Sequence, residues 1–71
     1  MTDLTILREW HSQGASYRPL YLKPPERDVG ERLAVWRRDL EHYEAFLNGE
    51  LVGVLADFER VARFLAGEEV S

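Results

Sequence analysis

The chain has 71 residues, a net charge of −4 and no cysteine. This length allows one small domain over residues 1–71, which would bury only about 60% of the surface that its unfolded chain exposes. The lack of cysteine excludes disulfide bonds and thiolate metal sites. The acidic balance argues against a protein that binds the phosphates of nucleic acid.

The sequence also predicts where the protein resides. Its first residues lack the basic and apolar regions of a signal peptide, and no apolar run approaches the roughly 20 residues that cross a bilayer. The absence of cysteine fits a reducing compartment. We therefore expect a cytoplasmic protein without a membrane anchor.

A short first helix is predicted over residues 3–13. Leu4, Leu7 and Trp10 would form its apolar face, and Gly14 would end it. A helix of this length is unstable in isolation, so it would have to dock on the rest of the chain.

Residues 14–25 are predicted to be an extended connector. All three prolines of the chain lie in it, and each proline pushes the preceding residue toward an extended conformation. The alternation around Tyr17 and Tyr21 also fits a short edge strand.

Residues 26–66 carry the strongest pattern, because apolar residues recur there at steps of three and four. These residues are Val29, Leu33, Trp36, Leu40, Tyr43 and Leu47, followed by Leu51, Leu55, Phe58, Val61, Ala62 and Leu65. Asn48-Gly49 would end the first helix and allow the second to return. We therefore predict a helical hairpin over residues 26–66, an all-α domain of three helices, and an acidic tail over residues 67–71.

Asn48-Gly49 is also a strong signal for a two-residue β-hairpin turn. In this alternative Phe46 faces Leu51, and residues 33–36 supply a third strand. Asp57 then caps a C-terminal helix from Phe58 to Ala66. The result is an α+β fold with a three-stranded antiparallel sheet and a C-terminal helix.

Two observations favour the helical fold over this sheet. Residues 33–36 are continuously apolar, whereas a half-buried strand usually alternates. Residues 37–41 lack the Gly or Asn that a tight turn between two strands would favour.

The sequence contains no motif for catalysis or cofactor binding. His11 and His42 are the only imidazoles, and their spacing does not match a metal site. Glu41 and Glu44 lie three residues apart, but a domain this small offers little room for a cleft between paired carboxylates. We therefore predict that the protein is not an enzyme and binds neither a metal nor a cofactor.

Apolar and aromatic residues outside the helical stripe predict a surface that contacts another protein, because the short first helix cannot cover them all. The contacts are assigned to Tyr17, Arg18, Tyr21, Val35, Phe46 and Phe64, since aromatic residues and arginine dominate protein interfaces. We predict a small acidic interaction module, such as a regulatory subunit or a phage-type inhibitor of a larger protein or complex. Its partner would present a basic surface or be a second copy in a homodimer.

The alternative function belongs to the sheet fold. Arg32, Arg37 and Arg38 form the only basic cluster, and beside Trp36 on a three-stranded sheet they would resemble a surface that binds nucleic acid. The neighbouring acidic residues make a charge-balanced surface the favoured interpretation.

Overall fold

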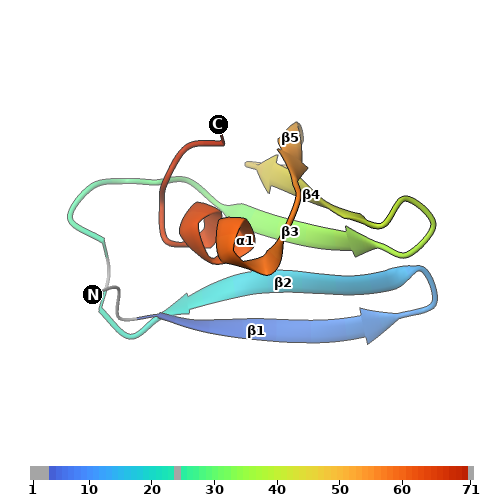
Figure 1. The fold of residues 1–71 in the computed structure, drawn as a ribbon. Coiled ribbons are helices and arrows are strands. Elements are labelled where there is room, and N and C mark those ends of the chain that lie inside the picture. Colours follow the sequence, from blue (N-terminus) through green and yellow to red (C-terminus); the bar gives the residue numbers. More distant parts are fainter. Residues whose placement is uncertain (1–3, 24, 71) are drawn as a thin grey trace.

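The computed structural model describes residues 4–23 and 25–70. Five antiparallel strands lie side by side in the order of the sequence and are followed by one helix. The elements are β1 (Leu4–His11), β2 (Gly14–Tyr21), β3 (Arg32–Arg37), β4 (His42–Leu47), β5 (Glu50–Leu55) and α1 (Phe58–Leu65). The helix lies across one face of the twisted sheet, which we call the helix face (Figure 1). The opposite face is called the open face.

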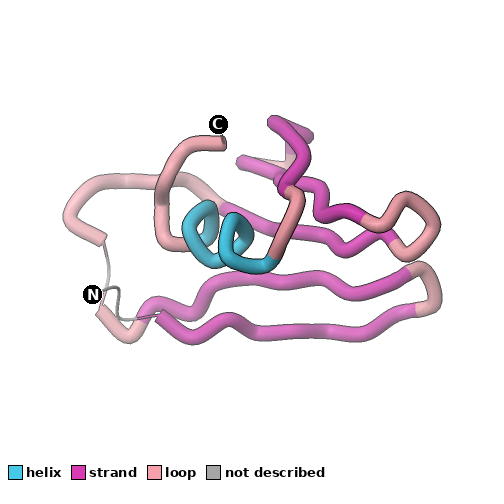
Figure 2. Tube along the Cα trace, in the orientation of Figure 1, coloured by secondary structure: helices cyan, strands magenta, loops and turns pink. Residues whose placement is uncertain are grey.

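The prediction of an all-α, small helical domain is wrong, because strands form most of the regular structure (Figure 2). The predicted helix over residues 3–13 is β1 and the turn that follows it, and the connector over residues 14–25 contains β2. Residues 26–66 hold three strands and α1 instead of a helical hairpin. Asp3, Pro24 and Ser71 lie outside the described residues.

The alternative sheet corresponds to β3, β4, β5 and α1, and it lacked β1 and β2. Asn48 and Gly49 have φ values of 52° and 83°, as a two-residue hairpin turn requires. Phe46 pairs with Leu51 as that alternative predicted. A bulge beyond this pair shifts the register by one residue, so that Ala45 pairs with Gly53.

The β3–β4 turn forms without the glycine or asparagine that we expected of it. Glu41 has a left-handed backbone conformation with a φ of 54°, and its N–H donates to the carbonyl of Arg37 at 2.8 Å. This conformation destabilises a residue that has a Cβ by roughly 1–2 kcal/mol. The sequence therefore gave no sign of the turn, and the surrounding pairing between β3 and β4 imposes it.

The hydrophobic core lies between α1 and the helix face. Ala15, Ala34 and Ala45, on three neighbouring strands, are completely buried. Their small side chains allow the helix to approach the sheet closely. Val61 and Leu65 of α1 are also completely buried, and they fill the space above the alanines.

Aromatic rings extend this core toward the start of the helix. The rings of Tyr17 and Phe58 pack edge to face with their centroids 5.3 Å apart. The ring centroids of Trp36 and Tyr43 lie 4.8 Å apart. Such pairs stabilise by about 0.5–1.5 kcal/mol beyond their buried area. Burial, followed by the charges of Tyr17 and Asp57, raises the pKa of Tyr43 above its usual value.

Both ends of α1 are capped. The Asp57 side chain accepts a hydrogen bond from the backbone N–H of Arg60 at 3.0 Å, which is the cap that the sheet alternative assigned to it. At the other end the buried guanidinium of Arg32 donates to the carbonyls of Phe64 at 2.9 Å and Glu68 at 2.6 Å. A positive charge at this end complements the helix dipole. Arg32 thus joins the start of β3 to the end of α1.

Within the described residues, no helix has the length and apolar character needed to cross a membrane.

Candidate protein-binding surface

The residues of the open face follow from the strand register, because directly paired residues of antiparallel strands share a face. Leu33 pairs with Phe46, which pairs with Leu51, and Val35 belongs to the same face by alternation. The apolar residues of the open face, together called the apolar belt, are Leu7, Leu20, Leu33, Val35, Phe46, Leu51 and Val54. They come from all five strands.

Much of the apolar belt is exposed to solvent. The exposed fractions of Leu7, Leu20, Leu51 and Val54 are 43%, 49%, 51% and 52%. Sheets that have one face in water normally alternate apolar and polar residues, so that the solvated face is polar. Here β3 supplies large apolar residues to both faces, which is why residues 33–36 show no alternation. Broad exposed apolar areas are typical of surfaces through which proteins contact other molecules.

Charged side chains surround one end of the apolar belt. Arg37 lies on the open face and bridges Asp39 at 3.1 Å and Glu44 at 3.2 Å. The hydrogen bonds that Arg37 donates hold the pKa of the Asp39 carboxyl below its usual value. The same bonds, to Asp39 first and then to Glu44, raise the pKa of Arg37. One guanidinium faces two carboxylates here, so these three side chains keep a net charge of −1.

Arg18 is a second charged residue within the belt, in addition to Glu44, which lies between Val35 and Val54. It follows Ser16 by two positions on β2, and Ser16 pairs with Val35 of the open face. Arg18 is exposed, and it makes no ion pair among the described residues. It also lines a small hollow with Leu33, where pairing between β2 and β3 has ended. Pro19, which has no N–H to donate, lies next to this break in the ladder.

Three of the six predicted contact residues meet on the open face: Arg18, Val35 and Phe46. Tyr17 and Phe64 are only 6% and 2% exposed, and both belong to the core, where they cannot contact a partner. Tyr21 is on the helix face, and its hydroxyl donates to the carbonyl of Leu65. Those three assignments are corrected, because a helical period cannot tell which strand face a residue occupies.

The prediction missed Leu7, Leu20, Leu33, Leu51 and Val54 as members of the surface. It had placed Leu33 and Leu51 in the buried stripe of the hairpin and Leu7 on the docking face of the first helix. Pairing the chain outward from Asn48-Gly49 would have placed Leu51 opposite Phe46 and Leu33 beside them. Leu7 and Leu20 carry no such signal, because β1 and β2 are joined to β3 by long-range pairing.

The predicted basic cluster is divided by the fold. Arg32 is buried on the helix face and Arg37 is held in ion pairs on the open face. Arg38 lies in the β3–β4 turn, where its backbone N–H donates to the carbonyl of Gln13 at 3.3 Å. The three arginines therefore share no single surface.

In the part of the chain that the structure describes, no group of three or more His, Asp or Glu side chains is placed to hold a metal ion. His42 lies on the open face beside Arg37, and its buried Nε2 atom has no hydrogen-bond partner there.

Comparison of the chain with protein-family models, with curated proteins and with solved structures finds no match.

Proposed function

We infer that this protein acts by binding another protein through the open face of its sheet. The observation that carries this inference is the apolar belt, which crosses all five strands and is left uncovered by the single helix. Burying apolar area contributes about 25 cal/mol per Å², so covering such a face is a substantial driving force for association.

The size of the face suits a protein partner. With strands spaced about 4.8 Å apart, the outer strands lie about 19 Å from each other, and six residues of strand extend about 20 Å. A surface of these dimensions covers about 400 Å², which is half of the roughly 800 Å² that each partner buries in a standard protein interface, so it would form the central part of such an interface. Small ligands instead bind in concave pockets that enclose most of their surface.

The charges on the face indicate the chemistry of the partner. Arg18 stands among leucines, so a partner with a carboxylate or an aromatic ring opposite it would gain a specific contact. Arg37 is already paired with Asp39 and Glu44. A largely apolar partner surface with one acidic group fits this arrangement better than a strongly basic one.

The role of regulatory subunit or inhibitor, like the cytoplasmic location, stays part of this proposal and is supported only by the small size, the acidity and the lack of cysteine. We do not retain the nucleic-acid function, because Arg32 is buried and occupied by carbonyl groups.

The experiment places a photo-crosslinking amino acid at Leu20 on the open face or, as a matched control, at Leu40. Leu40 lies in the β3–β4 turn and is 50% exposed, compared with 49% for Leu20. We expect a discrete crosslinked protein from position 20 and none from position 40.

A binding measurement with the purified partner then completes this test. Leu20→Glu should weaken the affinity by about tenfold or more, because it places a charge in the buried contact. Leu40→Glu should leave the affinity unchanged. Equal crosslinking or equal loss of affinity at the two positions would refute the assignment of the open face.

A further inference from the structure

The two edges of the sheet differ in how they are protected. Each edge strand leaves one row of backbone N–H and C=O groups without a strand partner, which makes it a template for an added strand. On β5 the ladder contains a bulge, and Val70 packs so closely on Gly53 that an added Cβ there would lie 2.5 Å from it. Bulges and covering segments are two of the devices by which proteins protect an edge.

Strand β1 has neither device. Its register with β2 runs without interruption from the pair Leu4–Tyr21 to the pair His11–Gly14, over eight residues that include no proline. None of those eight residues is buried, none pairs with a described strand other than β2, and Trp10 is 62% exposed. The β1 edge is therefore long, regular and accessible.

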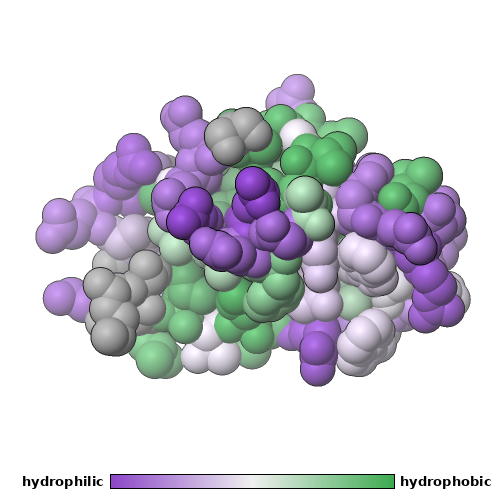
Figure 3. Space-filling model, viewed as in Figure 1, coloured by the Kyte–Doolittle hydropathy of each residue, from purple (hydrophilic) through white to green (hydrophobic). Residues whose placement is uncertain are grey.

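A groove runs beside this edge on the helix face. The helix packs mainly on β3, β4 and β5, and β1 extends beyond its cover (Figure 1). Leu4 and Ile6 of β1 and Ala62 and Ala66 of the helix line the groove, which encloses about 470 Å³. Figure 3 shows that the outer side of α1 is polar, while apolar surface continues from the helix toward β1.

We propose that β1 and this groove bind an extended peptide segment of another protein as a sixth strand. In strand addition the main-chain hydrogen bonds to the edge provide affinity, and pockets for alternate side chains provide specificity. Alternate residues of the peptide would point to the helix face and enter the groove over Leu4 and Ile6. The helix would form the second wall of the site, opposite the edge strand.

The charges at the rim define the peptide further. Glu59 is paired with Arg63 at 3.2 Å, whereas Glu68 makes no ion pair among the described residues. Together the rim side chains Glu59, Arg63 and Glu68 carry a net negative charge. This charge complements a lysine or arginine near the end of the peptide that lies over Leu4. The alanines leave room for valine or leucine in the groove.

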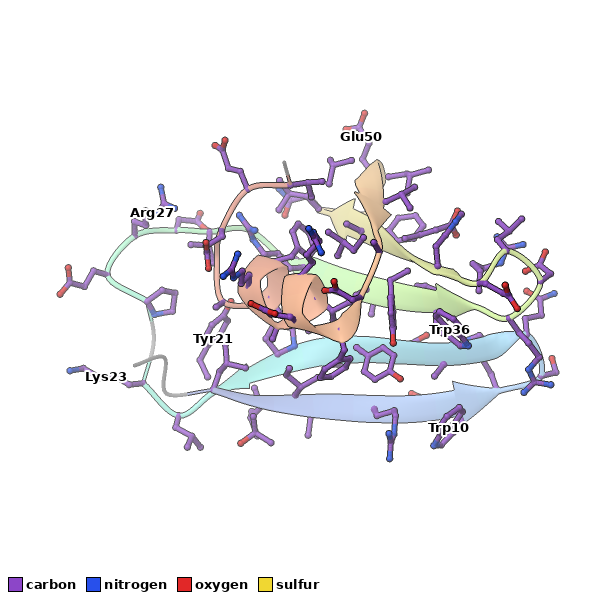
Figure 4. All side chains as sticks on the ribbon, in the orientation of Figure 1. Trp10, Tyr21, Lys23, Arg27, Trp36 and Glu50 are labelled. Carbon is purple, nitrogen blue, oxygen red and sulfur yellow. The ribbon has the colours of Figure 1, made fainter. Side chains whose placement is uncertain are left out.

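The other end of the site is marked by Trp10. It points to the same face as Ile6, and Arg8 lies over its ring at 5.0 Å from the centroid. Figure 4 shows Trp10 at the end of β1 that is distant from α1. An exposed tryptophan here would contact a third apolar residue of the bound strand, since aromatic anchors dominate binding surfaces.

This site is independent of the proposed function, because it uses the β1 edge and the helix face and leaves the open face free. Leu20→Glu on the open face should therefore preserve peptide binding. Ala62→Leu, which fills the groove with a residue of similar helix propensity, should preserve binding of the open-face partner. The two proposals can thus fail separately.

The test uses the full chain and a fluorescent peptide of about ten residues, with valine at alternate positions, threonine between them and lysine at both ends. A second peptide carries proline at two adjacent central positions, one valine and one threonine, because only alternate residues of a strand direct their N–H toward a given edge. We expect the first peptide to bind. The proline peptide should bind at least about tenfold more weakly, because proline has no N–H to donate to the edge strand. Ala62→Leu should weaken binding of the first peptide by a similar factor. Circular dichroism should show that this variant keeps its fold.

A charge exchange makes the test specific. Glu68→Lys should weaken binding of the lysine peptide. It should strengthen binding of the same peptide with glutamate in place of lysine. Amide exchange in β1 should slow when the peptide is bound.

The proposal is overturned if neither peptide binds up to about 1 mM, or if the proline peptide binds equally well. It is also overturned if β1 is protected in the free protein by a second copy, which would make this edge a dimer contact.

Discussion

On the helix face of the sheet Ala15, Ala34 and Ala45 are completely buried, whereas on the open face Leu20 and Val54 remain about half exposed. Ala15 and Leu20 even belong to the same strand, β2, and occupy its two faces because their positions differ in parity. The small residues lie where the helix packs, and the large apolar residues lie where nothing in the described chain covers them. Apolar residues along these strands therefore build the core on one face and, under the proposed function, a contact surface on the other.

If this division is correct, matched substitutions on the two faces should affect different properties. Core substitutions should lower the free energy of unfolding. Substitutions on the open face should change partner binding with little effect on stability.

The largest effect is expected for Leu65→Ala on the helix face, compared with Leu20→Ala on the open face. Leu65 is completely buried, so its truncation should lower the free energy of unfolding by about 2–5 kcal/mol. Domains of this size have little stability in reserve, and this variant should be largely unfolded. Leu20→Ala should change stability by less than about 0.5 kcal/mol. Urea unfolding followed by tryptophan fluorescence measures both, and equal losses would contradict the division between the faces.

A smaller effect is expected for the two arginines that lie on opposite faces. Arg32→Met removes the donors to the carbonyls of Phe64 and Glu68, which should cost about 1–3 kcal/mol. Arg18→Met keeps a long apolar side chain on the open face and should be nearly neutral for stability, while weakening binding of an acidic partner. Thermal unfolding by circular dichroism compares the two. A nearly neutral Arg32→Met would show that α1 does not depend on this contact.

Local signals predicted the C-terminal part of the fold once the sheet alternative was considered. Asn48-Gly49 indicated a two-residue turn, and Asp57 indicated the start of a helix, because both act through nearby backbone groups. These signals were outweighed by a three-and-four spacing of apolar residues. That spacing arose by coincidence from two apolar strand faces and from Leu40 in a turn.

The N-terminal part could not be predicted in the same way. Leu4, Leu7 and Trp10 fit one side of a helix, yet in β1 Leu7 lies on the open face and the other two on the helix face. Only pairing with β2, and of β2 with β3, fixes these positions, and such long-range contacts leave no local pattern. For the same reason the sequence could not separate Arg18, Val35 and Phe46, which lie on the open face, from Tyr17 and Phe64, which lie in the core.

The central claim is that the open face is exposed in the free chain and covered by a protein partner. Its most direct test is methyl NMR with a soluble paramagnetic agent, applied to the free monomer and then to the complex. The account predicts that methyl signals of Leu20, Leu51 and Val54 broaden strongly in the monomer and recover in the complex, while those of Val61 and Leu65 stay sharp in both. Protection of the open-face methyls in the free monomer, or their continued broadening in the complex, would contradict it.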